Sequence, residues 1–392
     1  MTGVQTCALP ILLIEGFLYP GHSVPRMHAV PEKTGRALMD RLLGAVSRCQ
    51  IDVLTSARVT GLYASRPSAS KLADPSGGVG RVGQGVCVEP RVLGLRCERP
   101  DGSSDELACD ALVLACSGFG GNRELVRRHL PAICDALYFG HEGNQGDAIR
   151  WGGELGAAVR DLGAYQGHGS VATPHGVLIT WALMTEGGVQ VNAQGRRFSN
   201  EMLGYSEQCL PVIEQPGGVA WDLYDERLHR LGMEFEDYRQ AFQAGAVRHA
   251  QTIEGLATAT GLPVDGLRAT LDEMRRCASG ASQDRFGRVF REDQQLAPPY
   301  YAVKVTAALF HTQGGLEVNG EARVLDESAN PLPNVFAAGG AARGVSGAHV
   351  WGYLSGNGLL AALTLGRIAG TAAARLALGR GHGQGQGPSR EK

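Results

Sequence analysis

Residues 110–121 read DALVLACSGFGG, a continuous apolar run that ends in a cluster of glycines. Such a run favours a strand that is buried on both faces and ends in a tight turn, as in a sheet covered by helices. Similar glycine turns occur further along the chain, GNQGD at 143–147 and AAGG at 337–340 paired with SGNG at 355–358. Glycine there lets the backbone approach a ligand at the carboxyl edge of a sheet.

The last of these turns, SGNG, opens the long apolar segment 356–378, which we expect to be a helix. The free N–H groups and the positive end of a helix dipole stabilise negative charge placed there. A reduced flavin carries such charge. One glycine turn by itself is more often structural, but all of them in one chain favour a dinucleotide cofactor and an α/β, doubly wound (Rossmann-like) domain.

Other segments are assigned by apolar spacing and turn residues. Helices are expected at 34–49, with Thr34 as cap, and at 252–260 and 265–277; a strand pair at 51–64; and strands at 86–99, 300–309, 316–325 and 334–338. Residues 66–85 contain ten Gly, Ser or Pro and predict an exposed loop, and residues 379–392 predict a disordered tail.

Composition excludes several classes of protein. The 392 residues include 37 basic and 39 acidic side chains, which leaves a net charge of −2 without a run of one sign, so no nucleic-acid partner is expected. The 9 cysteines show no CxxC pair and no metal-ligand spacing, which indicates reduced thiols and no metal site. No apolar stretch of about 18 residues is evident, so we expect no transmembrane segment and a cytoplasmic protein.

Several motifs, taken in series, carry a family resemblance. They are VLACSGFGGN (113–122), GNQGDAIRWGGELGA (143–157), VQVNAQGRRFSNE (189–201), YYAVKVTAALFHTQGGLEVN (300–319), and LPNVFAAGGAARGVSG (332–347) followed by GRIAG (366–370). In this order they resemble the flavoprotein family of fumarate reductase and succinate dehydrogenase, which also contains 3-ketosteroid dehydrogenases. The resemblance covers roughly residues 17–375 and implies an FAD-binding domain interrupted by an α+β clamp domain.

The resemblance also implies boundaries and cofactor contacts. The FAD-binding domain would comprise 12–158 and 303–378, and the clamp domain 159–302. FAD would contact Val59, Gly118, Gly120, Gly121, Gly146, Asp147, Gly339, Gly340, Ser355, Gly356, Asn357, Gly358 and Leu359.

The beginning of the chain departs from the family pattern. Residues 1–11, MTGVQTCALPI, resemble the translation of a sequencing adapter, and no GxGxxG turn precedes residue 118, whereas the family begins with such a turn after a strand. We therefore expect the first βαβ unit to be absent and the chain as written to hold FAD poorly. An inactive truncated fragment is accordingly one of the alternatives.

Active-site positions of the family are matched in part. The two histidines that hold a substrate carboxylate in fumarate reductases match His168 and His311, with Thr312 beside the latter. The family's two arginines do not appear: Tyr205 stands at the first position, and the stretch His349–Trp351 at the second. Without arginine a dicarboxylate would lose its bidentate partners. A histidine in such a place is otherwise often a satisfied core or loop residue.

Tyrosine at position 205 resembles the ketosteroid dehydrogenases, where a tyrosine takes part in proton transfer. Those enzymes carry a second tyrosine before the final flavin helix, which matches Tyr353, although simple packing would also explain it. His349 is retained as a substrate-binding candidate. A polar cluster of His22, Arg26 and His28 would either face substrate or lie in a surface loop.

The sequence therefore predicts an FAD-dependent oxidoreductase that acts on a carbon–carbon bond next to a carbonyl or carboxyl group. Desaturation of a ketone or steroid-like substrate is preferred, with Tyr205, His168, His311 and Tyr353 as catalytic residues. Fumarate-type reduction of an unsaturated carboxylate is the alternative. The partner that delivers or accepts electrons is not identified by any residue pattern.

Overall fold

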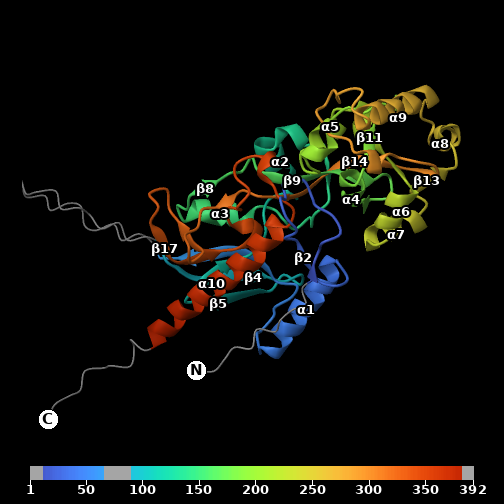
Figure 1. Cartoon of the computed structure of the whole chain (residues 1–392). Helices are drawn as coiled ribbons and strands as arrows, with labels where there is room; N and C mark the ends of the chain where they lie inside the picture. Colours follow the sequence, from blue (N-terminus) through green and yellow to red (C-terminus); the bar gives the residue numbers. More distant parts are fainter. Residues whose placement is uncertain (1–11, 66–89, 382–392) are drawn as a thin grey trace, which may run out of the picture.

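Figure 1 shows a computed structural model of the chain, which describes residues 12–65 and 90–381. The expectations for residues 1–11, for the loop 66–85 and for the last eleven residues lie outside the described part. The described chain is elongated, with α10 (Asn357–Gly381), β4 (Val92–Glu98), β5 (Ser104–Ala108) and β17 (Pro331–Ala337) at one end and α8 (Ile253–Thr260) and α9 (Val264–Ala278) at the other (Figure 1).

The largest sheet runs through the middle of the molecule in the order β10–β9–β14–β12–β11, and β13 and β7 also pair with β14. All of its pairs are antiparallel except β14 with β7. Its strands are β7 (Leu137–Tyr138), β9 (Tyr165–Ala172), β10 (Val177–Leu178), β11 (Val189–Val191), β12 (Val219–Asp225), β13 (Val247–Ala250) and β14 (Tyr300–Thr312). The pairing of β9 with β14 places His168 opposite Ala308.

Smaller sheets lie outside the central sheet. β6 pairs in parallel with β17, and β16 completes that sheet. The strands are β6 (Leu112–Leu114), β16 (Arg323–Leu325) and β17 (Pro331–Ala337); β3 (Arg58–Ala64), β4 (Val92–Glu98) and β5 (Ser104–Ala108); β8 (Val159–Arg160) with β15 (Gly315–Leu316); and β1 (Leu12–Leu13) with β2 (His28–Ala29). Gly340 and the other glycines after β17 therefore lie next to those after β6.

The helices begin where the sequence supplies caps. Thr34 accepts a hydrogen bond from Ala37 N at the start of α1, and Thr252 does the same for Gly255 N at the start of α8. The helices are α1 (Gly35–Arg48), α2 (Arg123–His129), α3 (Asp147–Glu154), α4 (Ala182–Thr185), α5 (Cys209–Ile213), α6 (Glu226–Gly232), α7 (Glu236–Gln243), α8 (Ile253–Thr260), α9 (Val264–Ala278) and α10 (Asn357–Gly381). The expected helices at 34–49, 252–260 and 265–277 are confirmed to within about one residue at most ends.

Helix α10 covers the sheet of β6 and β17. Ala369 and Ile368 on this side of the helix pack against Phe336 of β17. The α10 segment Asn357–Gly379, with a mean hydropathy of 1.3, is long and apolar enough to cross a membrane by length and composition alone, and only 17% of its most apolar part is buried. Core helices of soluble proteins can have the same length and composition, but they are mostly buried. Our expectation that no stretch reaches this length was therefore too strict, and the absence of a transmembrane segment stays a prediction.

Three expected elements differ from the structure. Residues 51–57 are not a strand, because Gln50 and Ser56 adopt left-handed conformations (φ 52° and 51°) that interrupt an extended chain. The segment 316–325 forms two short strands with a turn between them. The apolar run 110–117 was expected to be a strand buried on both faces, but only Leu112–Leu114 form a strand, β6. β6 lies at the edge of its sheet and pairs with β17 alone, and within it only Leu114 is buried. In the predicted tail, residues 379–381 still belong to α10.

Candidate functional site

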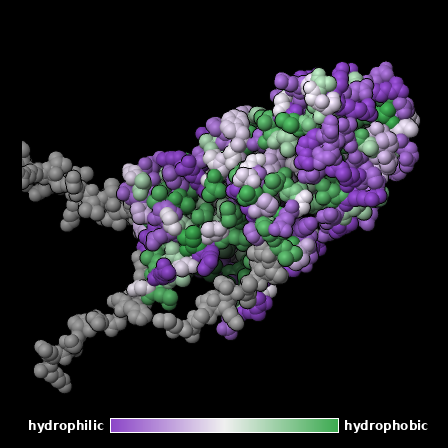
Figure 2. All heavy atoms as spheres, viewed as in Figure 1, coloured by the Kyte–Doolittle hydropathy of each residue, from purple (hydrophilic) through white to green (hydrophobic). Residues whose placement is uncertain are grey.

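A cavity of about 560 Å³ lies between the two ends of the molecule. Glycine turns and the start of α10 form one wall, and aromatic residues of the central sheet and its neighbours form the other. Figure 2 shows apolar residues gathered around a hollow in the middle of the visible face. The residues of interest that line the cavity are Tyr19, His168, Trp181, Tyr205, Phe310, His311, Thr312, Tyr353, Ser355, Gly339, Gly340, Gly356, Gly358 and Leu359. The structure therefore brings all four predicted catalytic residues together.

His168 lies on β9 and is buried, with its ring stacked between Tyr205 (centroids 4.8 Å apart) and Phe310 (5.4 Å). The backbone N–H of Ser170 donates to its Nδ1 at 3.0 Å, so the ring proton is assigned to Nε2. Burial lowers the pKa of His168 to about 3. The imidazole is therefore a neutral Nε2–H donor throughout the physiological pH range.

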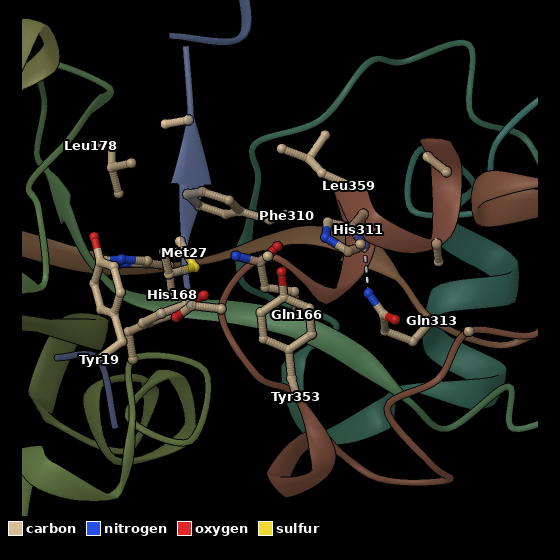
Figure 3. Close-up of a pocket in the computed structure, with 18 of the residues that line it drawn as sticks. Tyr19, Met27, Gln166, His168, Leu178, Phe310, His311, Gln313, Tyr353 and Leu359 are labelled. Carbon is tan, nitrogen blue, oxygen red and sulfur yellow. Dashed lines mark hydrogen bonds between the residues drawn. The ribbon is translucent and has the colours of Figure 1, made fainter. Parts of the chain in front are cut away.

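His311 follows Phe310 on β14, and Gln313 Nε2 donates to its Nδ1 at 2.9 Å, as the dashed line in Figure 3 marks. Ser346 Oγ donates to Gln313 Oε1, which fixes the amide in this orientation. A longer contact of 3.4 Å from Nδ1 to Thr312 O would require the other tautomer, and we favour the shorter bond. Burial lowers the pKa of His311, so this imidazole is also a neutral donor at Nε2.

Tyr205 and Tyr353 lie beside the histidines. The ring of Tyr205 is 6.1 Å from that of Tyr353, which is itself 5.8 Å from the His311 ring. Burial raises the pKa of Tyr205 well above its usual value; the neighbouring Tyr353 adds to this, and a hydrogen bond with Ser355 opposes it. Both phenols are therefore protonated donors, and neither exists as a stable phenolate at neutral pH.

The cavity carries little fixed positive charge. Among the described residues that line it, Lys33 is the one lysine or arginine. Its Nζ lies 3.7 Å from Glu234 Oε2 and 5.3 Å from the centroid of the Phe235 ring, so part of its charge is already compensated. Asp237 also lines the cavity, and burial raises the pKa of its carboxyl. A substrate with two carboxylates would find no guanidinium here.

The glycine wall fits a flavin cofactor. A Cβ on Gly340 would lie 2.8 Å from Gly118 N, and one on Gly358 would lie 2.6 Å from the His311 ring. Only glycine therefore allows the turn at 337–340 to approach the turn at 117–121, and the start of α10 to approach His311, this closely. Gly358 and Leu359 of the first turn of α10 face the cavity, where N–H groups favour negative charge. These residues would hold the ring system of FAD.

The glycine turn at 143–147 lines a second cavity of about 1080 Å³, whereas Gly118, Gly120 and Gly121 line neither this cavity nor the first. Gly146, the left-handed cap of α3 (φ 82°), and Asp147 both face the second cavity, together with Arg58. Gly121 N donates to Asn144 O, and Gly146 N donates to Gly118 O, so the turns at 117–121 and 143–147 form one unit. Gly120 packs against the Tyr138 ring. Val59, the residue after Arg58, is partly buried and packs against the hydrophobic core of the small sheets.

Some predicted residues lie elsewhere. His349 is exposed and stacks on Trp351 (4.9 Å), away from the cavity lining. Asn357 Nδ2 donates to Ser346 Oγ, so its side chain holds the α10 start instead of facing the cavity. Of the cluster at 22–28, His28 lines the cavity, while Arg26 bonds to Ser23 at the surface.

Several lining residues escaped the sequence analysis. They are Tyr19, Gln166, Trp181, Phe310 and Gln313. Figure 3 shows Tyr19, His168, Phe310 and Tyr353 grouped around one space. Gln166 lies two residues before His168 on β9, and strand alternation places both on the same face, a signal that was available. Trp181 and Tyr19 come from irregular segments and carried no such signal.

Gly118→Ala should destabilise the protein by about 1–3 kcal/mol, because the new methyl group would collide with Thr312 Oγ1 in a fully packed region. The measurement is denaturant unfolding. Gly153→Ala is the matched control, since Gly153 lies in α3 with nothing within 4 Å of a new Cβ, and it should be neutral or stabilising by up to about 1 kcal/mol. Equal behaviour of the two variants would contradict the close packing at Gly118.

Comparison with known proteins agrees with this geometry. The family model described as FAD binding domain matches residues 18–359. A probable fumarate reductase of Shewanella frigidimarina is 31% identical over 272 residues, 69% of this chain and 45% of that protein. A 4-oxocyclohex-2-ene-1-carboxylate 5-dehydrogenase of Sinomonas cyclohexanicum is 30% identical over 309 residues, 69% of this chain and 51% of that protein. The chain thus spans about half the length of these relatives.

A solved structure shares the arrangement over most of the described chain. The open conformation of a flavocytochrome c3 fumarate reductase superposes with a TM-score of 0.71 at 27% identity, covering 94% of this chain and 61% of that one. The α/β fold predicted from the glycine turns is confirmed by this likeness. The boundaries predicted for the clamp domain stay a prediction.

Proposed function

This chain belongs to the FAD binding domain family, within the flavoproteins that include fumarate reductases and 3-ketosteroid dehydrogenases, and on that premise we propose that it desaturates a cyclic ketone next to its carbonyl group. The observation that carries this proposal is the character of the cavity. His168 and His311 are neutral donors, Tyr205 and Tyr353 are protonated, and Lys33 supplies the one permanent cation of the lining.

Each residue has a distinct task in this reaction. FAD, held by the glycine wall, would supply the two-electron oxidation. The Nε2–H groups of His168 and His311 hydrogen-bond the carbonyl oxygen, which stabilises the charge that develops on it. The hydroxyl of Tyr205 takes the proton from the carbon next to the carbonyl while it passes its own proton on toward solvent, and Tyr353 orients that hydroxyl. Phe310 and Trp181 exclude water from the apolar part of the substrate.

Reduction of an unsaturated carboxylate is the second candidate. It is supported by the 31% identity to the probable fumarate reductase and by the two histidines. A carboxylate needs strong cationic partners in a buried site, and arginine provides them best. The part of the chain that the structure describes contributes no arginine to the lining, and Lys33 already contacts Glu234, so we place this candidate second.

The proposal is tested under anaerobic conditions with protein reconstituted with FAD, once its visible absorbance shows that the chain retains the flavin despite the expected poor binding. Cyclic ketones, including steroid-like ones, should bleach the visible flavin absorbance, and the unsaturated ketone should appear as product by mass spectrometry. Fumarate added to the reduced protein should leave the flavin reduced. Rapid reoxidation by fumarate with no bleaching by ketones would overturn the proposal in favour of the second candidate.

A further inference from the structure

Tyr205 needs a route by which its proton reaches solvent. The side chain is buried, and burial raises the pKa of its hydroxyl, so a phenolate does not persist between turnovers. Its hydrogen-bond partners Ser355 and Tyr353 are also largely shielded from solvent. A tyrosine in this position takes up a proton only if it passes its own proton on to another group.

A small cavity of about 90 Å³ lies against this tyrosine pair. It shares Tyr205, Tyr353 and Ser355 with the main cavity, and Glu207 lines it as well. A water molecule occupies about 30 Å³ in the liquid, so the space accommodates more than one. Three hydroxyl groups and a carboxyl group provide the hydrogen-bond partners that such waters require.

The Glu207 carboxyl is partly buried, and no side chain among the described residues forms an ion pair or a hydrogen bond with it. Burial raises its pKa to about 7, opposed only by its own backbone N–H. Gly204 makes room for it: φ there is +135°, and a Cβ would collide with Glu207 Oε2. The carboxyl is therefore held in place by backbone packing and stays free to exchange a proton.

The titratable groups around Glu207 contain no strong cation. Tyr165 of β9 is buried, its hydroxyl has no partner, and the nearby carboxyl of Glu207 contributes to raising its pKa. Cys209 of α5 is buried, and burial raises the pKa of its thiol to about 12. On the other side lie Tyr205 and Tyr353, with His22 next to the backbone of Ser355. Protonation of Glu207 is thus set by burial and not by an ion pair.

We propose that Glu207 is the proton relay between the Tyr205–Tyr353 pair and solvent, acting through water in the small cavity. The proposal rests on the proposed function. Tyr205 Oη accepts the proton removed from the substrate carbon and releases its own proton through water to the Glu207 carboxylate. The carboxylic acid then loses this proton to bulk water. FAD, when held by the glycine wall, would be the two-electron oxidant that accepts the hydride of the second C–H bond.

The first experiment needs no turnover. In the full chain with ¹³Cζ-labelled tyrosine, the NMR signal of Tyr205, assigned with Tyr205→Phe, should shift with a midpoint near pH 7 as Glu207 ionises. Glu207→Gln should remove this shift and keep the fold, because the amide has the same size. Glu214→Gln, an exposed residue on the far end of α5, is the matched control and should keep it.

The second experiment measures ketone turnover against pH. Because the carboxylate form accepts the proton, kcat of the wild type should rise with pH through about 7. Glu207→Gln should lose this rise and fall on the order of tenfold in kcat, less than the 10²–10⁴-fold of a group that touches the substrate, with KM unchanged. Added formate or imidazole should restore turnover in this variant and leave the wild type unaffected.

The two experiments separate this inference from the proposed function. The relay would be overturned if the NMR signal of Tyr205 shifted with pH in the same way in the wild type and in Glu207→Gln. It would also be overturned if Glu207→Gln kept the pH profile of kcat of the wild type. If ketones fail to react but the Tyr205 signal still follows Glu207, the proposed function is wrong, and the coupling of Glu207 to Tyr205 stands.

Discussion

Tyr205→Phe should lower ketone turnover by about 10²–10⁴-fold, the range for loss of a positioned acid–base group. Phenylalanine keeps the ring that stacks on His168 at 4.8 Å, so substrate binding and the flavin spectrum should be preserved. Only the hydroxyl that bonds Ser355 and Tyr353 is removed. The expected signature is therefore a fall in kcat with little change in KM, measured by steady-state kinetics.

A control tyrosine distinguishes this effect from general disturbance. Tyr63 lies on β3, is 43% exposed and donates to Glu106, so Tyr63→Phe removes a hydroxyl far from the cavity. It should leave turnover unchanged. If Tyr205→Phe also turned over at the wild-type rate, Tyr205 would have no part in proton transfer, and Tyr353 would be the next residue to test.

Glu201→Gln should destabilise the fold by about 3–5 kcal/mol, the usual cost of removing one partner of a buried ion pair. The Glu201 carboxylate is fully buried and bonds Arg197 at 2.8 Å and Arg288 at 2.9 Å. Burial alone would raise its pKa, but the two guanidinium groups outweigh burial and lower it. The variant would leave Arg288 without its carboxylate and Arg197 with Asp284 alone, and denaturant unfolding measures the loss.

The pH dependence of this contribution has a definite sign. Because the pKa of Glu201 is lower in the folded than in the unfolded protein, its stabilising contribution is present above about pH 4.5 and is lost as pH falls through the folded-state pKa. Glu98→Gln is the control, since its ion pair with Arg96 is about half exposed and is worth at most about 1 kcal/mol. Similar losses in both variants would contradict a stabilising role for the buried network.

This network also supports the cavity. Trp181 Nε1 donates to the backbone oxygen of Glu201, and the Trp181 ring meets His168 edge-on at 5.7 Å. The motif RFSNE therefore supplies the buried arginine and glutamate that hold Trp181 in place. Arg197, one of the charged residues in this motif, serves packing and charge balance and lies away from the cavity lining.

Local sequence signals predicted the helices well. Thr34 and Thr252 cap their helices, and the glycine turns at 117–121 and 355–358 lie at strand and helix ends as expected. The strand pair at 51–64 failed because Ser56 turns the chain away from an extended conformation, and hydrophobic alternation does not report that. Family position suggested His168, His311, Tyr205 and Tyr353 as catalytic residues. All four line one cavity, whereas His349 lies at the surface, and their catalytic role stays a prediction.

The caps, the glycine turns and the available chemical groups could be predicted from the sequence, because these depend on residues a few positions apart. The tautomer of each histidine, and the lack of a side-chain partner for Glu207 among residues 12–65 and 90–381, follow only from the assembled fold. The backbone N–H of Ser170, on the same strand, sets the tautomer of His168. Gln313 sets that of His311, and the amide of Gln313 is held in turn by Ser346, 33 positions further along the chain. Protonation depends on burial and on partners that are distant in the chain, so only the assembled fold makes these groups neutral donors.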